Sequence, residues 1–357
     1  MKNGIDRLLE EPVLQAPLRG KRLALLTNNQ VRTADGRRGV DALREAGLAL
    51  TMLFSPEHGL GGSAEAGASV DDSRDPATGL PCISLYSNHK DIPGEAFDHF
   101  DLLLIDLPDV GVRYYTYPDT AFHALDSCAK ANCPVVLLDR ANPLGRTVEG
   151  PLIEPQLCSI VGRYPVPVRH GLTLGEYARL AIERFGLAPN VELQVIEPQL
   201  PPGDDPMFPD FGLPWIPPSP NLRSFEALCA YPGTCLFEGT NLSVGRGTET
   251  PFLLVGAPWA KPEQTLKLFD RTAYPGMAFK ICQFTPKQDK YGQQLCHGIQ
   301  IDITDCRACT KSFAAGFALL DAFRKASPDD FQFEHPEHFD RLLGTSRYRL
   351  TGTLLSV

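Results

Sequence analysis

The feature that most constrains the fold is an alternation, in the first half of the chain, of short apolar runs with amphipathic stretches. This alternation is typical of parallel strands joined by helices. The expected strands are residues 22–27, 48–54, 82–86, 102–107, 135–139 and 191–196. The expected helices are residues 40–46, 120–131 and 174–185. The pattern predicts an α/β fold with a Rossmann-like N-terminal domain, in which helices cover both faces of a parallel sheet.

Two of the expected helices begin at residues that can cap a helix. Asp119 and Thr120 could cap the second helix, because short polar side chains accept hydrogen bonds from its first amides. Thr173, followed three residues later by Glu176, has the capping-box pattern for the third helix.

The second half begins after a proline-dense segment, residues 198–220. Proline lacks an amide donor and fixes φ, so this segment is neither a central strand nor a helix interior. Beyond it lie strand-like runs at 252–255, 279–284 and 298–303 and a helix at 312–325. We therefore expect a Rossmann-like catalytic domain over residues 1–225 and a smaller α+β domain over 226–357 that closes the cleft.

Composition and charge exclude several classes of partner. The net charge is -9 and no run rich in Lys or Arg occurs, which argues against nucleic-acid binding. No apolar stretch approaches the roughly twenty residues that a membrane span needs. The first residues lack the apolar stretch and cleavage pattern of a signal peptide, so the sequence predicts a cytoplasmic protein.

The cysteines and the absent motifs narrow the chemistry further. Ten cysteines are spread through apolar segments and are expected to be buried thiols. Cys306 and Cys309 have metal-ligand spacing, but no second pair completes a tetrahedral site, so we expect no metal. The sequence also lacks the P-loop ending, the zinc-protease helix and the nucleophile elbow. We expect no cofactor.

The loops after the expected strands carry the polar side chains that could form a site. In open parallel sheets, ligands bind outside the carboxyl ends of the strands. The polar residues of these loops include Asn28, Glu57, His58, Asp106, Asp109, Arg113, Tyr115 and Asn142. Amides and carboxylates bind sugar hydroxyls, and aromatic rings cover the C–H faces of a sugar. The loops therefore predict a pocket for a ligand with many hydroxyls.

Glu57 is the main candidate for acid/base chemistry. It lies in a tight Pro-Glu-His-Gly turn, where burial could raise its pKa towards the range of a general acid. In the structural alternative, Glu57 caps the next turn and His58 bonds a backbone carbonyl, and spacing alone favours this alternative. Arg169 and His170 could likewise serve a site or the fold. Asp139 with Arg140 suggests a buried ion pair.

Several motifs, taken together and in order, resemble one known family. They are Ser-Pro-Glu-His-Gly at 55–59, Asp-Val-Gly at 109–111 with Arg113 and Tyr-Thr-Tyr at 115–117, Asn-Pro-Leu-Gly at 142–145, Val-Glu-Gly-Pro at 148–151, Pro-Pro-Ser-Pro-Asn at 217–221, Glu-Gly-Thr-Asn at 238–241 and Gly-Arg-Gly-Thr at 245–248. This set resembles the exo-β-N-acetylmuramidase family, long known only as a domain of unknown function. The resemblance covers residues 18–350.

The resemblance implies a two-domain hydrolase with a cleft between its domains, which releases N-acetylmuramic acid from the non-reducing end of peptidoglycan fragments. The family's proposed catalytic glutamate corresponds to Glu57 and its accompanying tyrosine to Tyr115. Ala141 stands where the family usually has proline, and Asn29 precedes Gln30 in a loop usually read Asn-Gln. These departures affect substrate detail more than reaction type.

Glycoside hydrolysis usually needs two carboxyl groups, of which Glu57 would be the acid. The second group stays open among Glu238, Asp106, Asp109 and Glu176, with Tyr115 or the substrate's acetamido group as substitutes. A guanidinium matches the lactyl carboxylate of muramic acid. The three candidates for this contact are Arg113, Arg169 and Arg246. The other expected substrate-binding residues are Asn28, His58, Asp109, Asn142, His170, Asn221, Glu238 and Asn241.

Two alternative functions are consistent with parts of the same sequence pattern. A non-catalytic binding protein for cell-wall sugars would have the same polar and aromatic cleft. A nucleotide-sugar transferase would share the Rossmann-like half, but no phosphate-binding loop supports it.

Overall fold

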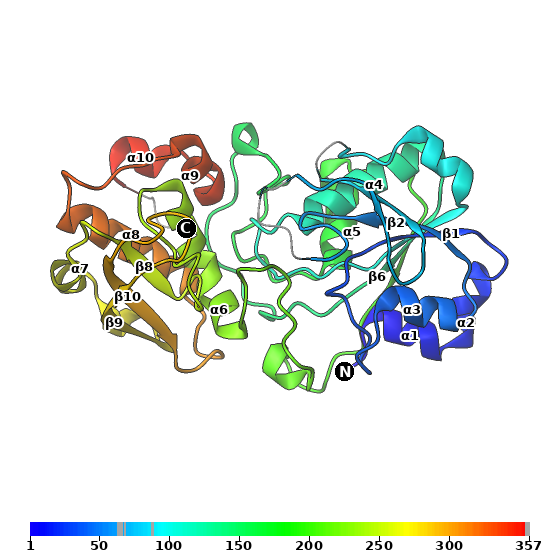
Figure 1. Ribbon diagram of the computed structural model, residues 1–357, viewed down its shortest axis with the longest axis horizontal. Coiled ribbons are helices and arrows are strands. Elements are labelled where there is room, and N and C mark those ends of the chain that lie inside the picture. The colour runs from blue at the N-terminus through cyan, green and yellow to red at the C-terminus, as the bar shows by residue number, and fades with distance from the viewer. Residues whose placement is uncertain (63–66, 68, 87–88, 354–357) are drawn as a thin grey trace. The chain divides into compact units, whose positions relative to one another are not determined.

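The computed structural model describes residues 1–62, 67, 69–86 and 89–353, which form two compact units (Figure 1). Unit 1 consists of Met1–Gly111, Tyr115–Arg146 and Leu172–Pro220. Unit 2 consists of Val112–Tyr114, Thr147–Gly171 and Asn221–Val357. The chain therefore passes between the units more than once. The division of the chain at residues 225 and 226 stays a prediction.

Unit 1 contains a mostly parallel sheet with the strand order β3-β4-β2-β1-β5-β6-β7. The strands are β1 (Leu23–Leu26), β2 (Leu50–Ser55), β3 (Ser73–Arg74), β4 (Pro81–Ser84), β5 (Leu102–Ile105), β6 (Val135–Leu138) and β7 (Leu193–Ile196). All neighbouring pairs are parallel except β3 with β4. The predicted parallel sheet is confirmed. Strand β3 was not predicted, because it has only two residues and both are exposed.

Alternation along the strands divides the core of unit 1 between two faces, because successive strand side chains point in opposite directions. Leu23 and Leu25 pack in one cluster with Ile5 of α1 (Gly4–Glu10) and Val40 of α3 (Gly39–Glu45). Helices α4 (Tyr117–Ala131) and α5 (Leu174–Phe185) lie on the other side of the sheet (Figure 1). The predicted helical cover of both faces is confirmed.

Helix α1 was not expected from the sequence. Its seven residues include Asp6, Arg7 and Glu10, so charge hides the short apolar pair Ile5 and Leu8. Both apolar side chains are fully buried. The shorter helical segments of unit 1 are α2 (Pro12–Gln15) and the 3₁₀ turns Ala16–Leu18, Gly94–His99 and Phe208–Asp210.

The start of α5 confirms the predicted capping box and ties the helix to the sheet. Thr173 Oγ1 accepts from the Glu176 amide at 3.2 Å, and Glu176 Oε2 accepts from the Thr173 amide at 2.9 Å. The same hydroxyl donates to Asp139 Oδ2 at 2.6 Å, just beyond β6. Asp139 Oδ1 also accepts from the Gly175 amide at 2.9 Å. One carboxylate therefore holds a strand end against a helix start.

The expected cap of α4 was wrong. The helix begins at Tyr117, and Asp119 lies in its first turn. Pro118 occupies the start of the helix, where its missing amide proton would in any case have no partner within the helix. The fixed φ of Pro118 suits the first turn of a helix, so α4 begins before Asp119 and Thr120, the residues expected to cap it.

Unit 2 contains an antiparallel sheet of β8 (Leu254–Ala257), β10 (Cys296–Ile303) and β9 (Met277–Phe284), in that order. The described helices are α6 (Phe225–Thr234), α7 (Pro262–Leu268), α8 (Ser312–Ala326), α9 (Pro336–Leu343) and α10 (Arg347–Thr351). Its 3₁₀ turns are Pro155–Leu157, Cys235–Gly239 and Arg271–Ala273. The expected α+β class of the second part is confirmed (Figure 1).

Close contact between α6 and α8 explains two glycines, one in each helix. A Cβ atom on Gly233 would lie 2.2 Å from the carbonyl oxygen of Ser312, and one on Gly316 would lie 2.3 Å from Gly233. These glycines therefore let two helices approach. In the part of the chain that the structure describes, no helix has the length and apolar character needed to cross a membrane.

We predict that Thr173→Ala destabilises the protein by about 1–3 kcal/mol, because it removes both the helix cap and the bond to Asp139. Thr173→Ser is the matched control, since it keeps the hydroxyl. The measurement is the free energy of unfolding in urea. Equal stability of the alanine variant and the native protein would contradict this role of the hydroxyl.

We also predict a pH effect from Asp139. Burial raises the pKa of Asp139 to about 6. As pH rises from 4 to 7, the unfolded chain loses this proton first, so the native state loses stability through this group. Asp139→Asn removes the titration, so its stability relative to the native protein should improve by up to about 3 kcal/mol over this range.

The control for this pH effect is Asp98→Asn, at an exposed aspartate of unit 1. Urea unfolding of the three proteins at pH 4 and pH 7 gives the comparison. A stability difference between Asp139→Asn and the native protein that does not change with pH would contradict the assignment.

Candidate active site

Glu57 follows β2 and holds a buried carboxylate among three donors. The residue is 6% exposed. Its Oε2 accepts from Thr116 Oγ1 at 2.5 Å, and its Oε1 accepts from the Gly67 amide at 2.9 Å. The Tyr86 hydroxyl also bonds the carboxylate, and burial together with the Glu57 charge raises the pKa of Tyr86. These donors fix the direction of the carboxylate.

The turn that carries Glu57 depends on two successive residues with positive φ. His58 and Gly59 both have φ of 69°. The Gly59 amide donates to the Pro56 carbonyl at 3.0 Å, which closes the turn. His58 is a non-glycine residue in the left-handed region, where backbone strain is concentrated at functional sites more often than elsewhere. The residue is 5% exposed, and its ring centroid lies 6.4 Å from that of Tyr117.

A hydrogen-bonded group of side chains supports this turn. Asn28 Nδ2 donates to the Tyr117 hydroxyl at 2.8 Å, and that hydroxyl donates to the Glu57 carbonyl at 3.2 Å. The Tyr115 hydroxyl donates to the Pro218 carbonyl at 2.8 Å. The rings of Tyr115 and Tyr117 lie 4.6 Å apart. The structure therefore brings together Asn28, Glu57 and both tyrosines.

Asp109 and Asn142 shape the loops after β5 and β6. Asp109 Oδ1 accepts from the amides of Val110 and Gly111 at 2.7 and 3.3 Å. Burial raises the pKa of Asp109 to about 7. Asn142 Nδ2 donates to the Leu172 carbonyl at 3.0 Å, and its Oδ1 accepts from the Leu144 amide at 2.9 Å. Both side chains have partners that organise the backbone.

The buried ion pair at the sheet edge differs from the one suggested by the sequence. Arg140 Nε donates to Asp106 Oδ1 at 2.7 Å, and Asp106 is fully buried. Asp139 instead bonds α5, as described above. The pairing of Asp139 with Arg140 was wrong, because adjacent residues at a strand end point to opposite faces.

Two of the three candidate arginines for a substrate carboxylate are buried in unit 2. Arg113 is 3% exposed and donates to the carbonyls of Pro151, Val166 and Leu342 at 2.6–2.9 Å. Arg169 is 2% exposed and donates to the Cys309 carbonyl at 3.1 Å. These bonds favour a structural role for both guanidinium groups.

The third arginine, Arg246, keeps 20% of its side chain exposed. It pairs with Glu238 at 2.6 Å, and its guanidinium lies 5.4 Å from the ring centre of Phe252. A ligand can therefore reach Arg246 more readily than Arg113 or Arg169. Glu238 and Arg246 are brought together within unit 2.

The other expected residues of unit 2 are Asn241, His170 and Asn221. Asn241 bonds the backbone at Asp330 and Gln332, which indicates a role in the loop structure. His170 and Asn221 are 3% and 8% exposed. Substrate binding by these three residues stays a prediction.

Two of the residues around Glu57 had no assigned role in the sequence analysis. Thr116 lies inside the Tyr-Thr-Tyr motif, which could have identified it. Tyr86 follows β4, and its loop was not among those compared. No local pattern marks a tyrosine at the end of a strand as a neighbour of a residue thirty positions away.

The described residues contain no group of three or more His, Cys, Asp or Glu side chains that could hold a metal ion. Three candidates for the second carboxyl group are paired with arginines. These pairs are Asp106 with Arg140, Glu176 with Arg146 and Glu238 with Arg246. Glu176 also completes the capping box of α5.

Comparisons with known proteins identify the family. Residues 23–226 match the model of the N-terminal region of exo-β-N-acetylmuramidase NamZ, and residues 229–351 match that of its C-terminal region. The chain is 38% identical over 351 residues to peptidoglycan β-N-acetylmuramidase NamZ of Bacillus subtilis (strain 168). This match covers 98% of the chain and 83% of that protein.

Two solved structures share the fold, and both are DUF1343 family proteins from Bacteroides fragilis NCTC 9343. The first has a TM-score of 0.86 and 28% identity, and covers 98% of this chain and 90% of its own. The second has a TM-score of 0.78 and 30% identity, with 99% and 91% covered. The resemblance drawn from the sequence motifs is thereby confirmed, together with the expected class of enzyme, a glycosidase. The chain belongs to the NamZ family of exo-β-N-acetylmuramidases.

Proposed function

We propose that this chain releases N-acetylmuramic acid from the non-reducing end of peptidoglycan fragments, with Glu57 as the general acid. The observation that carries the assignment of Glu57 is its buried carboxylate, which three donors orient at the carboxyl end of β2. Ligands of open parallel sheets bind at this end of the strands. The B. subtilis relative is a peptidoglycan β-N-acetylmuramidase, which supports the substrate class.

The donors around Glu57 suit a group that must change its protonation state. Glycoside hydrolysis begins with proton transfer to the leaving oxygen. A general acid gives its proton to the leaving oxygen, so the O–H of protonated Glu57 must point to the substrate while its neighbours adjust to the neutral carboxyl group. The hydroxyls of Thr116 and Tyr86 can each donate or accept, whereas the Gly67 amide only donates. Glu57 can therefore keep one orientation before and after it gives up its proton.

The substrate-binding residues in unit 1 are proposed on the same basis. Asn28 and His58 adjoin the turn that carries Glu57, and Tyr115 packs against Tyr117 beside it. We propose that Tyr115 positions the turn through Tyr117, because its hydroxyl already donates to the Pro218 carbonyl. Among the three candidate arginines, all of which belong to unit 2, Arg246 is the one that a carboxylate could reach, because a fifth of its side chain is exposed.

The test uses a disaccharide of N-acetylmuramic acid linked β-1,4 to N-acetylglucosamine, with products identified by mass. We expect free N-acetylmuramic acid from the native protein. In Glu57→Gln, turnover should fall by a factor of about 10²–10⁴, which is the usual contribution of a general acid. Glutamine keeps the size and one acceptor of the side chain, so the fold should persist.

Glu95→Gln is the matched control, because Glu95 is an exposed residue of unit 1. Near-normal turnover by Glu57→Gln would refute the assignment of the acid. If the native protein binds the disaccharide in calorimetry but releases no sugar, the alternative of a non-catalytic sugar-binding protein replaces the proposal.

We further propose that the protein acts in the reducing cytoplasm. All ten cysteines are free thiols, and nine of them are buried or half-buried. Free thiols persist where the compartment keeps them reduced. Immunoblotting of fractions from the producing cells should recover the protein with cytoplasmic markers. Recovery with the medium or the cell envelope would contradict this location.

A further inference from the structure

Strand β9 forms a free edge of the antiparallel sheet in unit 2, and the proposed chemistry does not use it. In the order β8-β10-β9, only β10 has a strand on each side (Figure 1). The outer edge of β8 is closed, because Gly256 and Ser243 exchange backbone hydrogen bonds at 2.8 and 3.0 Å. Strand β9 has no such bridge to any described residue. A free edge is a template for pairing with another strand.

The register of the ladder shows which backbone groups of β9 point outward. The Ile301 amide donates to the Leu253 carbonyl at 2.8 Å, so the backbone groups of odd-numbered residues in β10 point to β8. The Thr304 amide donates to the Gly276 carbonyl at 2.9 Å, so those of even-numbered residues point to β9. Backbone groups alternate in direction along each strand of an antiparallel pair. The residues of β9 whose amides and carbonyls point away from β10 therefore include Phe279, Ile281 and Gln283.

These three residues leave their outward backbone groups available. Outside the ladder with β10, no described residue donates to or accepts from the amide or carbonyl of Phe279, Ile281 or Gln283. Such groups must bond water or another strand. Ile281 also carries an apolar side chain that is 48% exposed. A second strand would therefore satisfy backbone groups and cover an isoleucine at the same place.

A hollow of about 510 Å³ lies beside this edge. Its lining joins Ile281 and Gln283 of β9 to Gln264 and Lys267 of α7. Directly opposite side chains of an antiparallel pair lie on the same face of the sheet. The hollow therefore leaves space beside Ile281 for the side chain of a residue that pairs with it.

The sequence of β9 is suited to pairing with itself in one register. In an antiparallel pair of two copies centred on Ile281, the two Ile281 residues meet, and Phe279 of each copy meets Gln283 of the other. All three outward residues then bond, which gives about six backbone hydrogen bonds. Lys280 of each copy lies opposite Cys282 of the other, so no like charges are directly opposed.

The neighbouring registers are less favourable. A pair centred on Lys280 places the two lysines directly opposite each other, which is destabilising. Centring on Phe279 places Gln283 opposite Pro275, which has no amide proton. Centring on Cys282 or on Gln283 pairs Phe279 with a residue beyond the end of β9. The register centred on Ile281 therefore pairs all three outward residues within the strand without opposing like charges.

We propose that two copies of this chain pair along β9 to form a two-fold symmetric dimer in which one sheet continues through both copies. The symmetry axis passes between the two Ile281 residues, as a self-complementary contact requires. The contact is small, so the dimer should dissociate in the micromolar range. The proposal goes beyond the proposed function, because this pairing requires neither Glu57 nor a substrate.

Sedimentation equilibrium of the native protein should show a concentration-dependent dimer of twice the 39.1 kDa mass of the chain. Ile281→Lys places like charges opposite each other at the centre of the contact, so it should weaken the dimer by about tenfold or more. Lysine suits a free strand edge, so the fold should persist. Val13→Lys is the matched control, because Val13 is a 74% exposed residue of α2 in unit 1. It should dimerise as the native protein does.

Gln283→Pro tests the backbone contact independently of side-chain charge. Proline removes an outward amide of β9 but leaves the bonds to β10 in place, so this variant should also weaken the dimer. Gln283→Ala is its control, because alanine keeps the amide and should keep the dimer. Far-ultraviolet circular dichroism establishes that each variant is folded. If Gln283→Pro does not fold, the comparison of Ile281→Lys with Val13→Lys decides the question alone.

The proposal is overturned if the native protein stays monomeric throughout the micromolar range, or if Ile281→Lys dimerises as strongly as Val13→Lys. Equal dimerisation of folded Gln283→Pro and Gln283→Ala would also overturn it. A native monomer that instead binds a peptide of unrelated sequence along β9 would assign the edge to a different partner and reject the second copy.

Discussion

Polar side chains at the carboxyl edge of the sheet in unit 1 must find partners inside the protein, and the arrangement of the site follows from this constraint. The strands themselves are almost wholly apolar and buried, as Leu23–Leu26 and Leu102–Ile105 illustrate. Immediately beyond them the chain places carboxylates and amides that are equally buried. A buried polar group without a partner costs more than a typical hydrogen bond contributes. The loops are therefore tied to one another.

Each strand end meets this constraint with a different partner. The carboxylate of Asp106 after β5 pairs with Arg140, and that of Asp139 after β6 holds the start of α5. Asn28 after β1 bonds Tyr117, whose hydroxyl reaches the turn after β2. The same bonds that stabilise the edge thus position Glu57. A side chain that transfers a proton must be held in one orientation, and hydrogen bonds from neighbouring residues provide this.

Much of the fold followed from local pattern, and the exceptions have identifiable causes. The apolar runs located the parallel strands, and the capping box of Thr173 and Glu176 located α5. Helix α1 was missed because three charges in seven residues hide its apolar pair. Helix α6 was missed because Pro232 and Gly233 suggest a loop, although the glycine serves close packing against α8. Periodicity describes one segment at a time and carries no information about what will pack against it.

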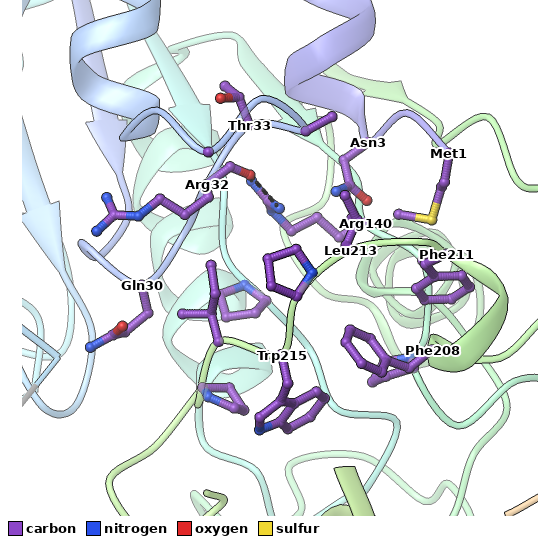
Figure 2. Close-up of a pocket in the computed structure, with 18 of the residues that line it drawn as sticks. Met1, Asn3, Gln30, Arg32, Thr33, Arg140, Phe208, Phe211, Leu213 and Trp215 are labelled. Carbon is purple, nitrogen blue, oxygen red and sulfur yellow. Dashed lines mark hydrogen bonds between the residues drawn. The ribbon is translucent and has the colours of Figure 1, made fainter. Parts of the chain in front are cut away.

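The sequence by itself determined the α/β class, the order of the strands along the chain and the position of Glu57 in a tight turn, because each depends on neighbours within a few residues. Tertiary structure alone decided the partners. It placed Thr116 and Tyr86 on the Glu57 carboxylate, paired Arg140 with Asp106 rather than Asp139, and set Arg113 against three backbone carbonyls. It also placed Asn3 and residues of the proline-dense segment on the lining of one cavity (Figure 2). Such pairings join residues that are tens to hundreds of positions apart, and they depend on packing distances that no local pattern encodes.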